Sequence, residues 1–207
     1  MKRTKKRFRV VGLDLAGVPH RPTGACCLFF PEAETSLVGT DEEIELFVAD
    51  RAPDLVVIDA PLHLPPGRTS IEDRNSSHYR PCDLELRRKR IPFFPITLGP
   101  MRTLTVRGMK LKQKLESQGF RVLEMYPGGA QDIWGIPRAA RNLAGLRNGL
   151  VRLGVKGLKK SATSHELDAV TGALVGRLYL RGEAEVYGDF SSGAILMPPG
   201  PKKPRPR

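Results

Sequence analysis

The chain has 207 residues, of which 34 are Lys or Arg and 22 are Asp or Glu, so its formal net charge is +12. A hydrophobic share of 40% is typical of a globular protein and excludes disorder along the whole chain. No apolar run approaches the roughly 20 residues that a membrane-spanning helix needs, which excludes a transmembrane protein and a membrane partner.

The first third of the chain predicts strands followed by a helix and a further strand. Residues 8–15 (FRVVGLDL) and 24–30 (GACCLFF) are rich in β-forming side chains, and a weaker strand is expected at 36–38. Residues 40–43 (TDEE) form a capping box that begins a helix. The wholly apolar run 55–58 (LVVI) predicts a strand that is buried on both faces of a sheet.

The remainder of the chain alternates helices and strands after one long loop. Residues 64–81 are rich in Pro, Gly, Ser and charge, and a loop of this length is usually functional or mobile. The elements expected after it are helices at 83–90 and 101–118, a strand at 120–125, one or two helices within 131–153, a helix at 163–180, and short strands at 185–187 and 194–197.

This order of elements predicts one α/β domain, in which a central mixed sheet lies between helices on both faces. We expect the domain to span residues 10–197. Residues 1–9 are expected to be a disordered basic arm, and residues 198–207 (PPGPKKPRPR) a disordered tail rich in Pro, Lys and Arg.

Four acidic residues lie where the secondary structure does not require them. Asp14 interrupts an apolar segment, Asp59 and Glu124 end two strands, and Asp168 lies in the first turns of the helix at 163–180. Ligands of open α/β sheets bind at the carboxyl ends of the parallel strands, so these side chains are expected to meet at one edge. Clustered carboxylates repel one another unless a cation neutralises them, and ligand sets made only of oxygen favour Mg²⁺ or Mn²⁺.

Each of these residues also has a simpler structural interpretation, because a single Asp after a strand is usually a turn or cap residue. Glu166 illustrates this, since residues 163–166 (TSHE) form a capping box that assigns Glu166 to the start of the helix. Asp168 lies two residues deeper and is not explained as a cap. The coincidence of four such acids favours a functional site.

The segments GLDLAG, VVIDAPL, VLEMYPGGAQ and HELDAVTGAL resemble an uncharacterised family of predicted nucleases with an RNase H-like fold, domain of unknown function four-two-nine. The resemblance covers about residues 8–197. It implies a three-layer α/β domain with carboxylates on the central strands and the last helix, which map to Asp14, Asp59, Glu124 and Asp168. The arginine-rich stretch 80–88 also resembles a family feature, without an assigned role.

The mechanism that this resemblance implies is metal-dependent hydrolysis of a phosphodiester. Asp14 would bridge two Mg²⁺ or Mn²⁺ ions, and Asp59, Glu124 and Asp168 would complete their ligand shells. One ion would activate a bound water and the other would stabilise the leaving oxygen, so no protein nucleophile is needed. Better-known RNase H enzymes carry an acid on the first helix that has no clear counterpart here, so Glu124 would have to take its place.

The charge of the chain is compatible with nucleic acid as the substrate. Residues 1–9 carry six basic side chains and residues 202–207 four, with no acid in either segment. Residues 80–121 hold 11 basic and 3 acidic side chains, whereas residues 10–79 hold 4 and 12. The candidate phosphate contacts are Arg87, Arg88, Arg107, Lys110 and Lys114. A solvated helix face and basic tails that serve only solubility explain the same charges equally well.

Two further candidates lie close to these features. His165 precedes Asp168 by three residues on the same helix face, so it is a candidate metal ligand or proton shuttle, or else an exposed residue of the first turn. Phe93 and Phe94 lie between prolines, where they are able to stack on bases, although anchoring of the loop in the core is the favoured interpretation.

The three cysteines, Cys26, Cys27 and Cys82, contain no CxxC pair. Such cysteines indicate reduced thiols, a cytoplasmic location and no disulfide-linked partner, and they exclude a zinc ribbon or finger. The basic start of the chain is not followed by the apolar stretch of a secretory signal, because Asp14 interrupts it.

Two other classes of function remain open beside the nuclease. One is a non-catalytic nucleic-acid-binding module on the same fold. The other is a phosphoryl-transfer domain, because Asp14 in GLDLAG also resembles the first phosphate loop of actin-like sugar kinases. Those kinases need two such domains, and 207 residues leave no room for the second.

Overall fold

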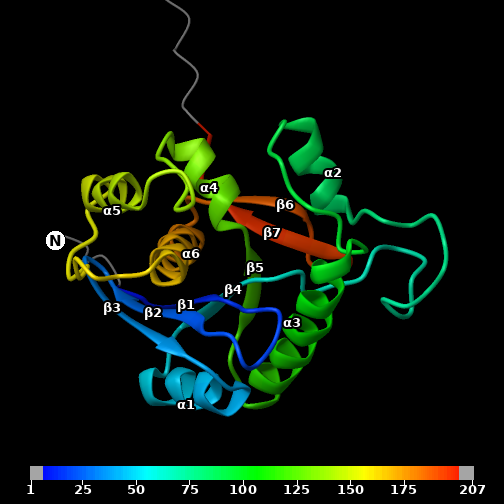
Figure 1. The fold of residues 1–207 in the computed structure, drawn as a ribbon, viewed down its shortest axis with the longest axis horizontal. Helices are drawn as coiled ribbons and strands as arrows, with labels where there is room; N and C mark the ends of the chain where they lie inside the picture. The colour runs from blue at the N-terminus through cyan, green and yellow to red at the C-terminus, as the bar shows by residue number, and fades with distance from the viewer. Residues whose placement is uncertain (1–6, 201–207) are drawn as a thin grey trace, which may run out of the picture.

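A computed structural model describes residues 7–200 of the chain (Figure 1). Its sheet has seven strands in the order β3-β2-β1-β4-β5-β7-β6. Strands β1, β4, β5 and β7 pair with one another in parallel. Strand β2 is antiparallel to both β1 and β3, and β6 is antiparallel to β7. The strands are β1 (Arg9–Asp14), β2 (Thr23–Phe29), β3 (Glu32–Val38), β4 (Leu55–Asp59), β5 (Val122–Met125), β6 (Glu185–Asp189) and β7 (Gly193–Met197).

Helices cover both faces of the sheet, which gives three layers. Figure 1 shows α4, α5 and α6 on one side of the sheet and α1 and α3 on the other. The helices are α1 (Asp41–Arg51), α2 (Pro81–Arg88), α3 (Gly99–Ser117), α4 (Pro127–Trp134), α5 (Leu143–Arg152) and α6 (Ser164–Leu180). The expected α/β class with a mixed sheet between helices is therefore confirmed.

Side chains along each strand point alternately to the two faces of the sheet, and this divides the core into two halves. In β1, Val10 packs in the cluster that contains α5 and α6, whereas Val11 packs in the cluster that contains α1 and α3. In β4, Val57 and Ile58 divide in the same way. Strands covered on both faces need apolar residues at every position, which explains the continuous run LVVI.

The elements expected from the sequence are present, with differences at their ends. The third strand begins at Glu32 and is longer than expected, because pairing with β2 extends it over seven residues. Helix α4 begins at Pro127, directly after β5, where proline is compatible with the first turn of a helix. The capping boxes of α1 and α6 are present as expected, with Thr40 and Thr163 as the N-caps.

Parts of the expected arm and tail lie outside the described residues, namely 1–6 and 201–207. Arg9, assigned to the arm, is the first residue of β1, and the amide of Gly200 donates a hydrogen bond to Glu185 Oε1 at 3.1 Å. Among the helices in the described part of the chain, none combines the length and the apolar character needed to cross a membrane.

Candidate active site

Asp14 and Asp59 lie side by side at the carboxyl ends of two neighbouring parallel strands. They are the last residues of β1 and β4 and are paired in the register of the sheet. Residues two apart in a strand point to the same face, so Asp14 shares the face of Val10 and Asp59 that of Val57. Both carboxylates therefore project toward α6.

The first turns of α6 bring two further groups to these carboxylates. His165 Nδ1 lies 2.6 Å from Asp14 Oδ2, and the side chain of His165 is about half exposed. Asp168 follows one turn later and accepts a hydrogen bond of 2.6 Å from Gln131 Nε2 of α4. The sequence thus predicted correctly that Asp14, Asp59 and Asp168 lie together, with His165 beside them.

The pKa values of this cluster reflect burial and mutual repulsion. Burial raises the pKa of Asp59 well above its ordinary value, and the charges of Asp14 and Asp168 raise it further. Burial and the charge of Asp14 raise the pKa of Asp168 to about 7. The hydrogen bond with Asp14 raises the pKa of His165. The site therefore favours bound protons, or another cation in their place.

Glu124 lies close by but projects from the opposite face of the sheet. Its register partner in β4 is Ile58, one residue before Asp59, so it shares the face of Ile58 rather than that of Asp59. Arg80 Nη1 and Nη2 donate to its two oxygens at 2.6 and 2.9 Å, and the amide of Leu62 donates to Oε2 at 2.8 Å. Glu124 nevertheless lines the same pocket as Asp59, and its charge contributes to raising the pKa of Asp59, so it lies near the other three acids but differs from them in being paired with an arginine.

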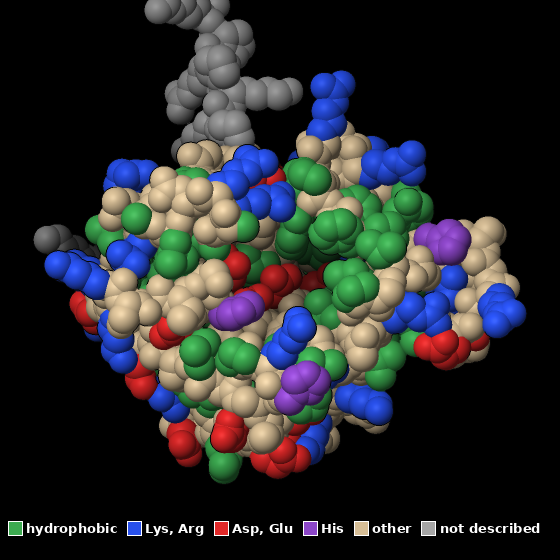
Figure 2. All heavy atoms as spheres, viewed as in Figure 1, with side chains coloured by type: hydrophobic (Ala, Val, Ile, Leu, Met, Phe, Trp, Pro, Cys, Tyr) green, Lys and Arg blue, Asp and Glu red, His purple; other side chains and the backbone are tan. Residues whose placement is uncertain are grey.

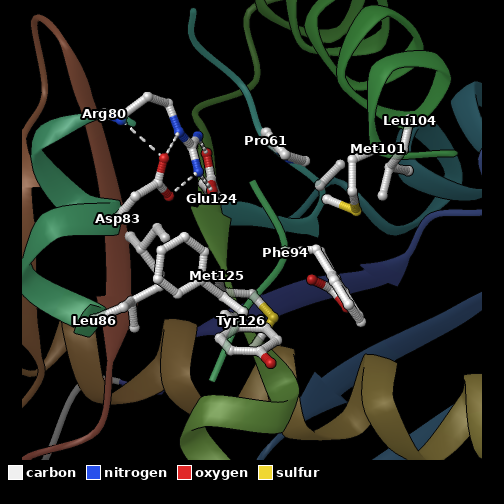
Figure 3. Close-up of a pocket in the computed structure, with 14 residues that line it drawn as sticks. Pro61, Arg80, Asp83, Leu86, Phe94, Met101, Leu104, Glu124, Met125 and Tyr126 are labelled. Atoms are coloured by element: carbon white, nitrogen blue, oxygen red, sulfur yellow. Dashed lines mark hydrogen bonds and ion pairs between the residues drawn. The ribbon is translucent and has the colours of Figure 1, made fainter. Parts of the chain in front are cut away.

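Arg80, Asp83 and Glu124 form a buried ion group that the sequence analysis did not assign (Figure 3). Arg80 Nη2 also donates to Asp83 Oδ1 at 2.9 Å, and Arg80 Nε donates to Asp83 Oδ2 at 3.1 Å. Each of the three side chains is at most 4% exposed. The sequence drew attention to the stretch 80–88 and to Glu124 separately, but nothing in it indicated that Arg80 binds both Asp83 and Glu124.

Gln131 is a second residue of the site without a role assigned from the sequence. It lies in α4, is 1% exposed, and donates both to Asp168 and to Thr171 Oγ1, the latter at 3.2 Å. Its segment, PGGAQ, was part of the family resemblance, but nothing in that segment shows that its glutamine faces α6. The contact fixes the orientation of the Asp168 carboxylate.

The five basic candidates differ in their surroundings. Arg87, Arg88, Lys110 and Lys114 are exposed, and Lys114 pairs with Glu45 at 2.5 Å. Arg107 is only 6% exposed, and its prediction as a phosphate contact is wrong. It donates to Asp41 Oδ1 from Nε and Nη2 and to the carbonyl of Ala16 from Nη1, so it joins α3 to α1 and to the end of β1.

The chemistry of the three convergent carboxylates fits a hard divalent cation. They offer oxygen donors only, and none of them is paired with Lys or Arg in the part of the chain that the structure describes. Within residues 7–200, however, no group of three or more His, Cys, Asp or Glu side chains is already arranged to hold a metal ion. A cation bound at Asp14 Oδ2 would take the place of the hydrogen bond that this oxygen makes with the exposed His165.

The fold and site together define an α/β protein with a carboxylate cluster at the ends of its central strands. The family described as "Protein of unknown function (DUF429)" matches residues 12–191, and the chain belongs to that family. Comparison with curated proteins and with solved structures gave no match.

Proposed function

We propose that the protein is a divalent-metal-dependent phosphodiester hydrolase that acts on nucleic acid, with Asp14, Asp59 and Asp168 as the residues that hold Mg²⁺ or Mn²⁺. The observation that carries the proposal is the convergence of these three carboxylates, none of which forms an ion pair with a Lys or Arg of residues 7–200. Such a cluster costs stability in the metal-free protein, and a bound cation removes that cost.

An RNase H-like fold is part of this proposal. It is supported by the three layers, by carboxylates on the central strands β1 and β4, and by a carboxylate on α6, the last helix. This is the placement of acids that the family resemblance implies. The exposed basic residues of α2 and α3 support a polyanionic substrate.

Each neighbour of the cluster has a defined task in this proposal. His165 holds a proton against Asp14 in the metal-free protein, and its exposure leaves it able to exchange that proton with solvent. Gln131 orients Asp168. Arg80 pairs with Glu124 and offsets the negative charge that Glu124 brings beside the site. A bound divalent ion supplies a water of lowered pKa and stabilises the leaving oxygen of the phosphodiester.

The position of Glu124 leaves three carboxylates to hold the two proposed ions. Its two oxygens accept hydrogen bonds from Arg80 and Leu62, so we assign Glu124 to positioning rather than to metal binding. Mg²⁺ is usually held by one or two carboxylates together with substrate phosphate oxygens and water. Three carboxylates are therefore sufficient for the proposed pair of ions once the substrate contributes its phosphate.

The test is a cleavage assay with Mn²⁺ on single-stranded DNA, duplex DNA, RNA, hybrid and branched substrates. Asp14→Asn keeps the size of the side chain and removes its charge, so we expect cleavage to fall at least about a hundredfold while the circular dichroism spectrum is unchanged. Asp50→Asn, which alters an exposed aspartate of α1, is the matched control and retains full activity.

Retained cleavage by Asp14→Asn would overturn the assignment of the site. If the unaltered protein binds these substrates and cleaves none of them with Mn²⁺ or Mg²⁺, the hydrolase proposal is wrong and the alternative of a non-catalytic nucleic-acid-binding module is correct.

A further inference from the structure

A pocket of about 170 Å³ opens beside the carboxylate cluster. Asp59 is one of its lining residues, so the pocket and the cluster share a wall. Most of the lining is apolar, and Figure 3 shows Pro61, Met101 and Phe94 around a common space. Figure 2 shows the same face hollowed, with acidic side chains in the hollow and hydrophobic side chains along one side, between α2 and α3.

Two adjacent phenylalanines in the loop before α3 have different roles at this pocket. Phe93 packs partly buried against the cluster around α2 and lies edge-to-face with Tyr79, with 6.1 Å between ring centroids. Phe94 is 69% exposed and lines the pocket. The interpretation that both anchor the loop therefore holds for Phe93 and is wrong for Phe94. A pocket lined mainly by apolar and aromatic side chains is typical of a ligand-binding site, and the exposed ring of Phe94 is available to a ligand that enters it.

Tyr126 supplies a second ring, and its orientation is fixed. Its hydroxyl donates to the carbonyl of Pro92 at 2.7 Å and accepts from Arg138 Nη1 at 3.1 Å. The bond to Pro92 ties the residue after β5 to the loop that carries Phe94. Both polar capacities of the hydroxyl are used outside the pocket, so Tyr126 presents ring carbons to it.

The polar end of the pocket has little hydrogen-bonding capacity to spare. It is formed by Arg80, Asp83 and Glu124, and every carboxylate oxygen of this group already accepts a hydrogen bond from Arg80. A ligand is therefore held mainly through ring faces and apolar contact. Such contact is tolerant of sequence, because every base presents a flat aromatic face.

The size of the pocket matches one aromatic ring. An apolar cavity of about 150 Å³ accommodates benzene, and this pocket is slightly larger. It is smaller than the roughly 300–1,000 Å³ of sites for drug-sized ligands. Because a base in a duplex is stacked on its neighbours, only an unpaired or extruded base is able to enter such a pocket.

We propose that this pocket binds one unpaired base of a nucleic-acid strand whose adjacent phosphate lies at Asp59, so that the protein prefers single-stranded over duplex substrates. This inference rests on the proposed function for the identity of the ligand. It adds the substrate class, which the carboxylates alone do not specify. Phe94 and Tyr126 supply the stacking surfaces.

Binding is measured by fluorescence anisotropy with the full chain in EDTA, which keeps every probe intact. The probes are a labelled decathymidylate, the same backbone with all ten bases removed, and a duplex of the decathymidylate with its complement. Repulsion by the metal-free carboxylates weakens the binding of all three probes, so the test compares the ratios of their affinities. We expect decathymidylate to bind at least about fivefold more tightly than either other probe, since stacking of one base accounts for that factor.

Phe94→Ala is expected to abolish this preference, and Phe94→Leu, which keeps the bulk without the ring, to reduce it. Phe190→Ala is the matched control, because Phe190 is 48% exposed and packs edge-on against Tyr179 near the opposite end of α6. Equal binding of the base-free strand, an unchanged preference in Phe94→Ala, or an equal loss in Phe190→Ala would each overturn the proposal. If the protein cleaves nucleic acid but its binding does not depend on bases, only the proposal for the pocket is wrong. If its binding depends on bases but it cleaves nothing, only the hydrolase proposal is wrong.

Discussion

Asp59 and Asp168 are carboxyl groups whose charged form is disfavoured in the folded protein. Burial raises both pKa values, and the neighbouring carboxylates raise them further. An acid whose pKa is raised in the folded state binds its proton more tightly there than in the unfolded chain. Its contribution to stability is therefore full below the unfolded pKa and is lost as the pH rises through the folded value, which for Asp168 is about 7.

This linkage predicts a pH-dependent gain from Asp168→Asn in the metal-free protein. The variant removes the charge and keeps an oxygen that accepts from Gln131. We expect its Tm to exceed that of the unaltered protein by about 2–4 °C at about pH 8, as a gain of about 1 kcal/mol would give. The gain should shrink toward about pH 5, where Asp168 is protonated in the folded state.

Thermal unfolding in EDTA at the two pH values measures this effect, with Asp50→Asn as the control because Asp50 is exposed and remote from the cluster. If the difference in Tm between Asp168→Asn and the unaltered protein is the same at both pH values, the charge of Asp168 does not destabilise the folded protein. Mn²⁺ should reverse the order at about pH 8, since only the unaltered site gains stability from binding the ion.

The residues that the sequence predicted correctly are those whose position depends on local pattern. Asp14 and Asp59 end strands, and Glu166 fulfils its capping box, with its backbone amide 3.3 Å from Thr163 Oγ1. The pairing of Glu124 with Arg80 was not predicted, because the two residues lie 44 positions apart and only the fold brings them together. Arg107 was misassigned because its partner, Asp41, lies 66 residues away.

At the scale of elements, close packing of α6 on the sheet delivers Asp168 and His165 to the strands. Gly12 of β1 and Gly24 of β2 make this approach possible. A Cβ at Gly12 would lie 2.1 Å from the carbonyl oxygen of Ala169, and one at Gly24 would lie 2.1 Å from that of His165. Both contacts are with helix backbone, so a side chain at either position has to displace the helix.

Gly12→Ala is therefore expected to destabilise the protein by about 1–3 kcal/mol or more, the usual cost of overpacking a core. Displacement of α6 should also reduce Mn²⁺-dependent cleavage, because Asp168 moves away from Asp14. Gly99→Ala is the matched control, since nothing lies within 4 Å of a Cβ at Gly99. Urea unfolding measures both variants, and equal stability of the two would contradict this account of α6.

The helix at 163–180 was well predicted from its capping box and apolar residues, but the reason for its burial was not. Ten of its residues are buried, and it contacts β1, β2 and β4. Its sequence differs little from that of an ordinary core helix. Gly12 and Gly24, against which this helix packs, lie more than 130 residues earlier in the chain. Their contact with the helix is therefore visible only in the folded structure.

At the scale of the whole molecule, acidic and basic side chains lie in different places. Asp14, Asp59 and Asp168 gather at the site, while exposed basic residues occupy α2 and α3 beside it. Arg107 is used internally, and Lys114 pairs with Glu45 of α1. Arg87 and Arg88 are exposed on α2, the helix that also supplies Asp83 and Leu86 to the lining of the pocket.

This arrangement predicts that Arg87→Ala combined with Arg88→Ala weakens binding of decathymidylate and makes it less sensitive to salt. Loss of two phosphate contacts lowers the slope of log K against log salt by about 1.4 for a single strand. Arg152→Ala, an exposed arginine of α5, is the control and leaves the slope unchanged. Anisotropy titrations over a series of salt concentrations measure this, and an unaltered slope in the double variant would exclude α2 from the contact surface.

The central claim, that the three carboxylates hold a divalent cation, is tested most directly by a crystal structure of the protein soaked in Mn²⁺ and recorded with anomalous scattering. The account predicts an anomalous peak within ligand distance of Asp14, Asp59 and Asp168, with Glu124 still bound by Arg80. A peak elsewhere, or a structure in which these three carboxylates bind no ion, would contradict it.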